Sequence, residues 1–307
     1  MVSSEPPAAP VLQHKDLYDI RAALFGGQYF DIDDDGIRTR DVVTGETLRP
    51  DEIPPALLLD PALSAGFDYL RTRGEQNNLT VELLLAPHSK ARDFTLMPEL
   101  HPETMAGPPV MGIEADWVPH DGVTSPLPDQ IELRPEPPAT GRGAFQQEQI
   151  SWLRAHSKTI LPCELADTDP SPLAQSLHHL WYGIYEKAAT DQTMTPPQRE
   201  GARLIARHVY QATRQWAILG QLGHWLHRLD TADQLPTGHL TALLMLGSWH
   251  HNSLHRLNHL LHVPAHTHTI PDSPEDTPAY KAYGNTWMHG LRTMRMDMDF
   301  LQTPLPY

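Results

Sequence analysis

The chain has little cysteine, little positive charge and no long apolar run, and each shortage excludes a class of protein. Its 307 residues include one cysteine, Cys163, which rules out a disulfide framework and a cysteine-rich zinc site. Lys and Arg number 23 against 38 Asp and Glu, giving a formal charge of −15 that disfavours general binding to nucleic acid or anionic membranes. No apolar run approaches the ~18 residues of a membrane span. Residues 1–13 lack a secretory signal, so we expect a cytoplasmic protein.

The sequence also lacks the short motifs that identify common active sites. It contains neither a Gly-x-Ser-x-Gly turn nor a Gly-x-x-x-x-Gly-Lys phosphate loop. Cys163 is a candidate nucleophile, but a single cysteine with many possible histidine partners carries little information. The sequence therefore names no catalytic residue and no cofactor-binding residue, and it leaves open whether the protein is an enzyme.

Charge and histidine are distributed unevenly along the chain. Residues 1–150 contain 25 acidic and 11 basic residues, a net charge of −14, whereas residues 151–307 contain 13 and 12, a net charge of −1. Histidine shows the opposite bias, with 4 in the first segment and 15 in the second. This difference predicts two domains. We expect a disordered tail over 1–13, an acidic, proline-rich α+β module over 14–134, a linker over 135–143 and a histidine-rich domain over 144–304.

The first half has the residue patterns of a small α+β module. Asp60 before Pro61 is a typical helix start and predicts a helix over 61–72. The turn at 33–36 joins strand-like runs at 28–32 and 37–43, which is more typical of a hairpin than of a calcium loop, because the twelfth loop position is Val42 and not Glu. Further strands are expected at 79–85, 92–96, 110–118 and 130–133.

The second half has the apolar spacing of amphipathic helices. Apolar residues recur every three or four positions, and Ser, Thr and Pro stand where helices would begin. We expect five helices, at 144–157, 171–188, 195–229, 236–263 and 273–301. The fold class predicted for the chain is therefore a small N-terminal α+β module followed by a C-terminal antiparallel bundle of about five helices.

Four histidines with helical spacing form the most informative pattern. His251, His255, His259 and His262 are spaced 4, 4 and 3 residues apart, so on an α-helix they lie within about 80° of one face. Imidazoles at i and i+4 converge well enough to bind zinc or a similar divalent ion. Histidines of the preceding helix, which would complete such a site, are His224 and His227.

A second interpretation of the histidines stays open. A segment with 15 histidines places some of them at this spacing by chance, and no His-Glu-x-x-His motif accompanies them. The same face would then be a polar, pH-sensitive surface that hydrogen-bonds neighbouring helices.

Arginines on the expected helix over 195–229 form a basic stripe. Arg199, Arg203, Arg207 and Arg214 are spaced 4, 4 and 7 residues apart. The stripe allows nucleic-acid binding, but Glu200 and the net charge of −15 favour an ordinary solvated helix face.

Three functions follow from these patterns, in order of preference. The first is a cytoplasmic binding or regulatory protein that engages a protein partner, or a second copy of itself, through the bundle surface. The second is a metal-dependent hydrolase or transferase that uses the histidine cluster. The third is a nucleic-acid-binding module that uses the arginine stripe, a partner that the acidic composition makes the least favoured.

Overall fold

The computed structural model describes the chain in segments. These are residues 29–33, 36–40, 47–48, 53, 57–58, 60–86, 91–120, 123, 126–164, 192, 196–247, 250 and 252–269, with the backbone alone for 29–48, 91–93, 196–213, 252 and 255. The chain divides into two compact units. One comprises Met1–Ala56, Pro170–Thr213 and Thr277–Tyr307, and the other comprises Leu57–Asp169 and Arg214–Asp276.

The first unit contains a small antiparallel sheet. Its strands are β1 (Tyr29–Asp33), β2 (Gly36–Arg40) and β3 (Thr47–Leu48), paired in the order β1-β2-β3. Asp33, the last residue of β1, pairs with Gly36, the first residue of β2. The structure thus confirms the expected hairpin around 33–36, because antiparallel strands flank the acidic turn where a calcium loop would have helices.

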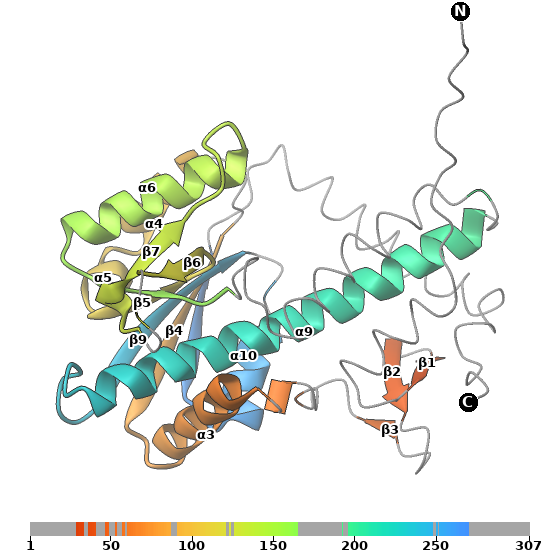
Figure 1. Ribbon diagram of the computed structural model, residues 1–307, viewed down its shortest axis with the longest axis horizontal. Helices are drawn as coiled ribbons and strands as arrows, with labels where there is room; N and C mark the ends of the chain where they lie inside the picture. The colour runs from red at the N-terminus through yellow and green to blue at the C-terminus, as the bar shows by residue number, and fades with distance from the viewer. Residues whose placement is uncertain are drawn as a thin grey trace, which may run out of the picture. The chain divides into compact units, whose positions relative to one another are not determined.

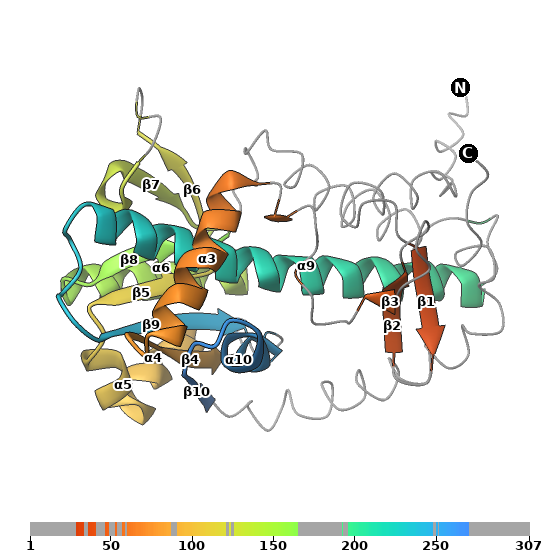
Figure 2. The same ribbon diagram turned by 90° about the horizontal axis from the view of Figure 1, so that it is seen from below.

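The second unit is built on a five-stranded parallel sheet. Its strands are β4 (Leu79–Ala86), β5 (Val110–Ile113), β8 (Thr159–Pro162), β9 (Leu240–Gly247) and β10 (Ala265–Thr269). They lie in the order β10-β4-β9-β5-β8, and every neighbouring pair is parallel (Figures 1 and 2). Buried apolar residues of β4, β5 and β9 lie on both faces of the sheet, as expected for a parallel sheet that helices cover on both sides.

Helices form a layer on each face of this sheet (Figure 1). One layer contains α4 (Ala91–Leu100), α5 (Pro102–Ala106) and α6 (Gly141–Ala155), whose apolar side chains pack with those of β4, β5 and β9. The Phe94 and Phe145 rings meet edge to face at 5.8 Å between centroids. The other layer contains α3 (Pro61–Glu75), the part of α9 (Pro196–Thr231) from residue 214 onward, and α10 (Asn252–His255) with the π-helical turn η4 (Arg256–Leu260).

The helices α3 and α9 approach so closely that their contact requires glycine. A Cβ on Gly66 would overlap the carbonyl oxygen of Gly220, and a Cβ on Gly223 would overlap that of Gly66. Phe67 and Trp216 pack edge to face beside this contact, with ring centroids 5.9 Å apart. The close approach holds α9, the helix that carries Arg214, against α3.

The order of connections determines where a ligand site is expected. After β4 and β5 the chain passes through helices of the α4–α6 layer, and a hairpin of β6 (Asp116–Pro119) and β7 (Ile131–Arg134) precedes α6. After β8 and β9 it passes through α9 and α10 on the opposite face. The neighbours β4 and β9, β9 and β5, and β5 and β8 therefore send their following helices to opposite faces. In parallel α/β sheets, ligands bind at the carboxyl ends of such strands.

The expected C-terminal helical bundle is wrong. Within the expected helix over 236–263, residues Leu240–Gly247 form strand β9, and of the residues described in that range only Asn252–His255 is α-helical. The run LTALLMLG is apolar on all sides, and periodicity alone does not separate a buried helix from a strand buried on both faces. The expected strand over 92–96 is likewise wrong, because these residues belong to α4. The second unit is α/β-like and has a parallel sheet.

Other predicted elements are confirmed. Asp60 caps α3 by accepting the N–H groups of Ala62 and Leu63 at 2.9 and 3.1 Å. The helices expected at 144–157 and 195–229 correspond to α6 and α9, and the strands at 79–85, 110–118 and 130–133 correspond to β4, to β5 with β6, and to β7.

Several predictions fall outside these observations. The expected helices at 171–188 and 273–301 lie outside the described residues. The division into a module over 14–134 and a domain over 144–304 stays a prediction, although the second compact unit draws residues from both segments. Among the described residues, no helix has both the length and the hydropathy needed to cross a membrane.

Candidate functional site

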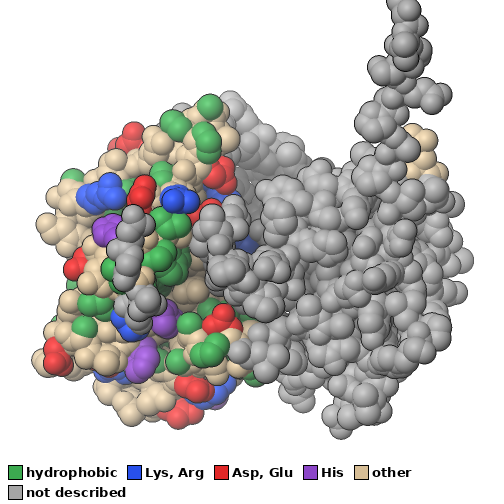
Figure 3. Space-filling model, in the orientation of Figure 1, with side chains coloured by type: hydrophobic (Ala, Val, Ile, Leu, Met, Phe, Trp, Pro, Cys, Tyr) green, Lys and Arg blue, Asp and Glu red, His purple; other side chains and the backbone are tan. Residues whose placement is uncertain are grey.

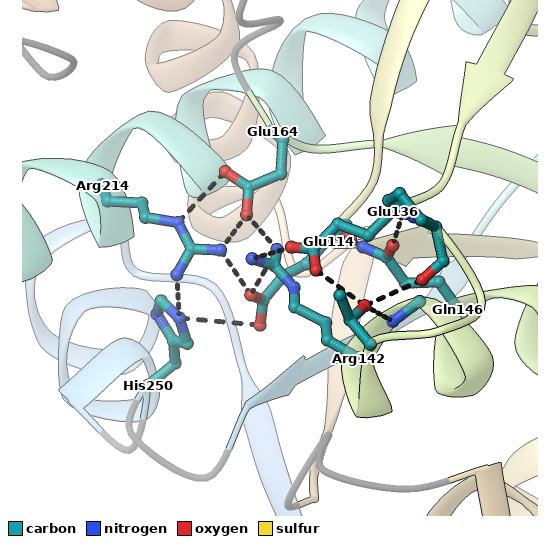
Figure 4. Close-up of polar contacts among 10 residues, drawn as sticks. Glu114, Glu136, Arg142, Gln146, Glu164, Arg214 and His250 are labelled. Atoms are coloured by element: carbon teal, nitrogen blue, oxygen red, sulfur yellow. Dashed lines mark hydrogen bonds and ion pairs between the residues drawn. The ribbon is translucent and has the colours of Figure 1, made fainter. Parts of the chain in front are cut away.

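Charged side chains meet at the carboxyl edge of the parallel sheet (Figure 4). Glu114 directly follows β5, Glu164 follows β8 by two residues, and His250 follows β9 by three. Because the three strands are parallel, their carboxyl ends share one edge, where α6 and α9 each add an arginine. The six residues, called the edge cluster below, are Glu114, Glu136, Arg142, Glu164, Arg214 and His250.

Arg214 lies at the centre of the edge cluster. Its Nε donates to Glu164 Oε2 at 3.1 Å, and its Nη2 donates both to Glu164 Oε1 and, at 2.6 Å, to Glu114 Oε2. This arrangement is bidentate on Glu164, a geometry in which arginine binds carboxylates strongly and with fixed orientation. One guanidinium thus bridges carboxylates that follow two neighbouring strands.

Glu114 connects the edge cluster to the rest of the unit. Its Oε1 accepts the backbone N–H of Gly247 at 2.5 Å, and its carbonyl oxygen accepts Gln146 Nε2 at 2.6 Å. The side chain is only 4% exposed. The carboxylate is therefore tied to the end of β9, and the backbone of the same residue is tied to α6.

His250 lies between an arginine and a carboxylate. Its Nε2 is 3.2 Å from Arg214 Nη1 and 3.6 Å from Glu114 Oε1, and the residue is 2% exposed. An arginine nitrogen only donates, so Nε2 accepts from it and carries no proton in this arrangement. A proton placed on the same nitrogen would face the Glu114 carboxylate.

The start of α6 positions Arg142 and Glu136. Thr140 caps the helix by accepting the Gly143 N–H at 2.9 Å. A Cβ on Gly143 would overlap the Pro137 carbonyl oxygen, so glycine lets the preceding segment lie against the helix. The Glu136 N–H donates to Gln146 Oε1 at 2.9 Å, and Glu136 Oε1 is 3.1 Å from Arg142 Nη1. Arg142 Nη2 lies farther from the other carboxylates, 3.4 Å from Glu164 and 3.8 Å from Glu114.

Burial makes the edge cluster costly for the fold. Three glutamates and two arginines give it a formal charge of −1 when His250 is neutral. Glu114, Glu164 and His250 are buried. Removing an ion from water costs several kcal/mol, which mutual pairing only partly offsets. Buried charge at the ligand-binding edge of a sheet is a feature of binding and catalytic sites.

Cys163 lies beside the edge cluster but does not have the character of a nucleophile. The thiol is fully buried and donates to the Leu161 carbonyl oxygen at 3.3 Å. Burial and the neighbouring Glu164 carboxylate raise the pKa of Cys163 well above its usual range. The reactive thiolate is therefore strongly disfavoured.

The four histidines expected on one helix face do not lie on a continuous α-helix. His255 ends α10, His259 lies in the π-helical turn η4, and His262 follows it with a φ of 56°. His259 and His262 are exposed, whereas His251 and the side chain of His255 lie outside the description. The convergence expected of imidazoles four residues apart on an α-helix therefore does not apply to His259 and His262.

The histidines proposed from the preceding helix lie on α9. His227 is exposed, and its ring centroid is 5.4 Å from that of Tyr69. His224 is partly buried, and burial together with the nearby Arg228 lowers its pKa to about 4. In the described segments, no group of three or more His, Cys, Asp or Glu side chains is arranged to hold a metal ion. Zinc binding by the histidines stays a prediction.

Sequence reasoning missed most of the edge cluster. Arg214 was grouped with a solvated stripe, yet its side chain is only 12% exposed. Glu114 and Glu164 were not singled out, although each follows a short apolar run. The available signal was an acidic residue at the end of a buried strand. It indicates a shared site only once the strands are known to be parallel, because their carboxyl ends then lie at one edge.

A second polar cluster, called the strand clasp below, joins β4 to β10. Glu82 Oε1 is 3.0 Å from His266 Nδ1, and Glu82 Oε2 is 2.7 Å from His268 Nε2. Burial alone would raise the Glu82 pKa, but hydrogen bonds and charge from the two histidines outweigh it, and the pKa is lowered. His101 packs on His268, with ring centroids 5.3 Å apart.

The visible surface does not favour the nucleic-acid interpretation. Figure 3 shows acidic, basic and hydrophobic side chains intermixed on one face of the described residues. The side chains of Arg199, Arg203 and Arg207 lie outside the description, and Arg214 is held in the edge cluster. At least one of the four arginines in the expected stripe, Arg214, therefore does not face solvent.

Comparisons with protein families, with curated proteins and with solved structures find no match for this chain. The geometry of the edge cluster is therefore the basis for assigning a function.

Proposed function

We propose that this protein binds a small polar molecule at the carboxyl edge of β5, β8 and β9, and that the edge cluster holds it. One observation carries the proposal. Glu114, Glu164 and His250 follow three different strands, and Arg214 joins all three at the edge where connections leave for opposite faces. Ligands of parallel α/β sheets bind at this position.

The energetics support the same proposal. The sheet is already held by parallel pairing and by apolar layers on both faces, so it does not need buried ions. Replacing a buried ion pair by apolar residues is often neutral or stabilising. Charges retained at such a cost are typical of functional sites.

A binding or regulatory role, the first function expected from the sequence, fits this proposal with a small molecule as the ligand. The cytoplasmic location and a protein partner or self-association remain parts of the proposal that the edge cluster does not address. Fractionation of cells and light scattering of the purified protein test these two parts.

Catalysis is a second candidate function, favoured by the placement of His250. This imidazole lies within reach of both Arg214 and Glu114, an arrangement suited to moving a proton. A His250→Gln variant would then bind the ligand but no longer convert it. A variant that keeps full turnover of the bound compound contradicts catalysis.

The proposed site is tested by a thermal-shift screen of polar metabolites that includes acids, phosphate esters, amines and sugars. A ligand at 100 times its Kd stabilises the fold by about 2.7 kcal/mol, which raises the melting temperature by roughly 5 °C. The screen compares the wild type with Glu164→Gln in the edge cluster and with Glu82→Gln, the matched control in the strand clasp.

The expected result is a compound that stabilises the wild type and Glu82→Gln but not Glu164→Gln. Circular dichroism shows whether each variant is folded at the start of the scan. A compound that stabilises all three proteins equally binds elsewhere and contradicts the proposal, as does a screen in which no compound stabilises the wild type.

A further inference from the structure

The two arginines of the edge cluster are held very differently. Arg214 is 12% exposed, makes a bidentate contact with Glu164 and lies 2.6 Å from Glu114. Arg142 is 35% exposed, and its contacts with the three carboxylates measure 3.1, 3.4 and 3.8 Å. Charge-assisted N–H···O bonds are normally about 2.7–2.9 Å long. Arg142 is therefore shared among three carboxylates and held firmly by none.

The carboxylates around Arg142 do not depend on it equally. Both oxygens of Glu164 are held by Arg214, and Glu114 is held by Arg214 and the Gly247 N–H. Glu136 is 38% exposed, and its other oxygen accepts the Thr140 hydroxyl at 3.2 Å. Glu136 is thus the partner that Arg142 exchanges most easily.

The backbone allows this exchange without a change of fold. The Glu136 N–H stays bound to Gln146, and α6 stays capped by Thr140, when the Glu136 carboxylate turns into water. Arg142 Nε is buried and has no hydrogen-bond partner among the described residues, so the guanidinium is incompletely satisfied. An acceptor with two oxygens would satisfy it better than the present contacts do.

We infer that Arg142 is the residue that recognises the ligand, and that it does so by exchanging the Glu136 carboxylate for an oxyanion of the ligand, a carboxylate or a phosphate. This inference rests on the proposed function and names the ligand class for that same site. The exchange replaces the Glu136 carboxylate beside Arg142 by the oxyanion of the ligand, so the guanidinium keeps an anionic partner. The displaced Glu136 carboxylate is solvated and screened by salt.

The inference assigns opposite effects to the two exchanging residues. Removing the guanidinium removes the binding group, whereas removing the Glu136 carboxylate removes the competitor. A cationic ligand would instead lose affinity when Glu136 is removed. The sign of the Glu136 effect therefore separates the two ligand classes.

The test uses inorganic phosphate and succinate as probes, titrated by isothermal calorimetry against a chloride background of constant ionic strength. The variants are Arg142→Ala, Arg142→Lys, Glu136→Ala and, as a control on the same helix, the exposed Arg154→Ala. Binding of phosphate but not succinate indicates a phosphate-bearing ligand, and the reverse indicates a carboxylic acid.

The expected result is a loss of about tenfold or more in affinity for Arg142→Ala, a smaller loss for Arg142→Lys and a severalfold gain for Glu136→Ala. Arg154→Ala is expected to bind as the wild type does. Because Arg142→Lys keeps the charge, it remains informative if the alanine variant is poorly folded by circular dichroism. Unchanged affinity in both Arg142 variants, or a loss with Glu136→Ala, overturns the inference.

Failure of this inference is distinguishable from failure of the proposed function. A neutral or cationic ligand that binds the wild type, loses binding in Glu164→Gln and ignores Arg142→Ala overturns the oxyanion assignment and leaves the site in place. If neither the probes nor any library compound binds at this edge, both are overturned.

Discussion

The second unit contains two ionic clusters that use similar residues in different environments. The edge cluster joins the ends of β5, β8 and β9 to α6 and α9, and its central carboxylates are buried. The strand clasp joins only β4 and β10, lies on the surface of the outer strand pair and leaves His266 largely exposed. The two clusters therefore differ in burial and in the number of elements that they join.

This difference indicates which cluster needs a functional explanation. A surface ion pair is worth between about zero and 1 kcal/mol and is a common way to secure an edge strand. A buried ionic cluster costs desolvation free energy to form, and removing one partner destabilises the fold. Stability alone therefore does not explain its presence. We place the ligand at the edge cluster for this reason.

The largest expected effect comes from removing the central arginine. Arg214→Ala leaves Glu114 and Glu164 buried without their shared partner, which we expect to cost about 3–5 kcal/mol in unfolding free energy. Urea denaturation followed by circular dichroism measures the unfolding free energies of the wild type and the variant.

Arg154→Ala on the surface of α6 is the matched control and should change the unfolding free energy by less than about 0.5 kcal/mol. An Arg214→Ala loss below about 1 kcal/mol would mean that the edge cluster behaves as a surface pair does, and the comparison would fail.

A medium effect is expected from His224, a partly buried histidine of α9. Burial and Arg228 lower the His224 pKa to about 4, so the unfolded chain binds more protons than the folded one as the pH falls from about 6.5. The wild type should lose about 2 kcal/mol of stability between pH 6.5 and 4.5 that His224→Gln does not lose. Urea melts across this range test it, with the exposed His120→Gln as control. Parallel pH profiles for the wild type and His224→Gln contradict the assignment.

The smallest effect is expected at the strand clasp. Glu82→Gln should cost less than about 1 kcal/mol at pH 7, because the pairs are partly exposed. The folded-state pKa of Glu82 is depressed, so its contribution is present above the unfolded value of 4.5 and is lost as the pH falls through the folded value. The wild type and the variant should therefore converge in acid. If Glu82→Gln lowers the unfolding free energy by about 3 kcal/mol or more at pH 7, the strand clasp contributes as much stability as the edge cluster and the comparison fails.

Local signals allowed much of the secondary structure to be predicted. Asp60 with Pro61 identified the start of α3, and the prolines at 196 and 197 identified the start of α9, because capping and proline chemistry act within a few residues. The hairpin at 33–36 followed from its glycine and aspartates for the same reason.

The sheet was missed because its signals are not local. The run over 240–247 is apolar on every side, and only its place between β4 and β5 makes it a strand. Interpreting this run as a helix leads to a predicted helical bundle, in which Glu114 belongs to a different module from Glu164 and His250. Once β5, β8 and β9 are parallel neighbours, polar residues just after them must share one edge. The arginines depend on the layer packing and have no comparable signal in the sequence.

Hydrogen exchange followed by mass spectrometry, with and without the compound selected by the thermal-shift screen, tests the central claim most directly. It compares the two clusters in one experiment. The account predicts protection at the strand ends, residues 113–115, 162–164 and 247–250, with no change at 79–86 or 265–269. Protection confined to β4 and β10, or to segments outside the edge cluster, would contradict it.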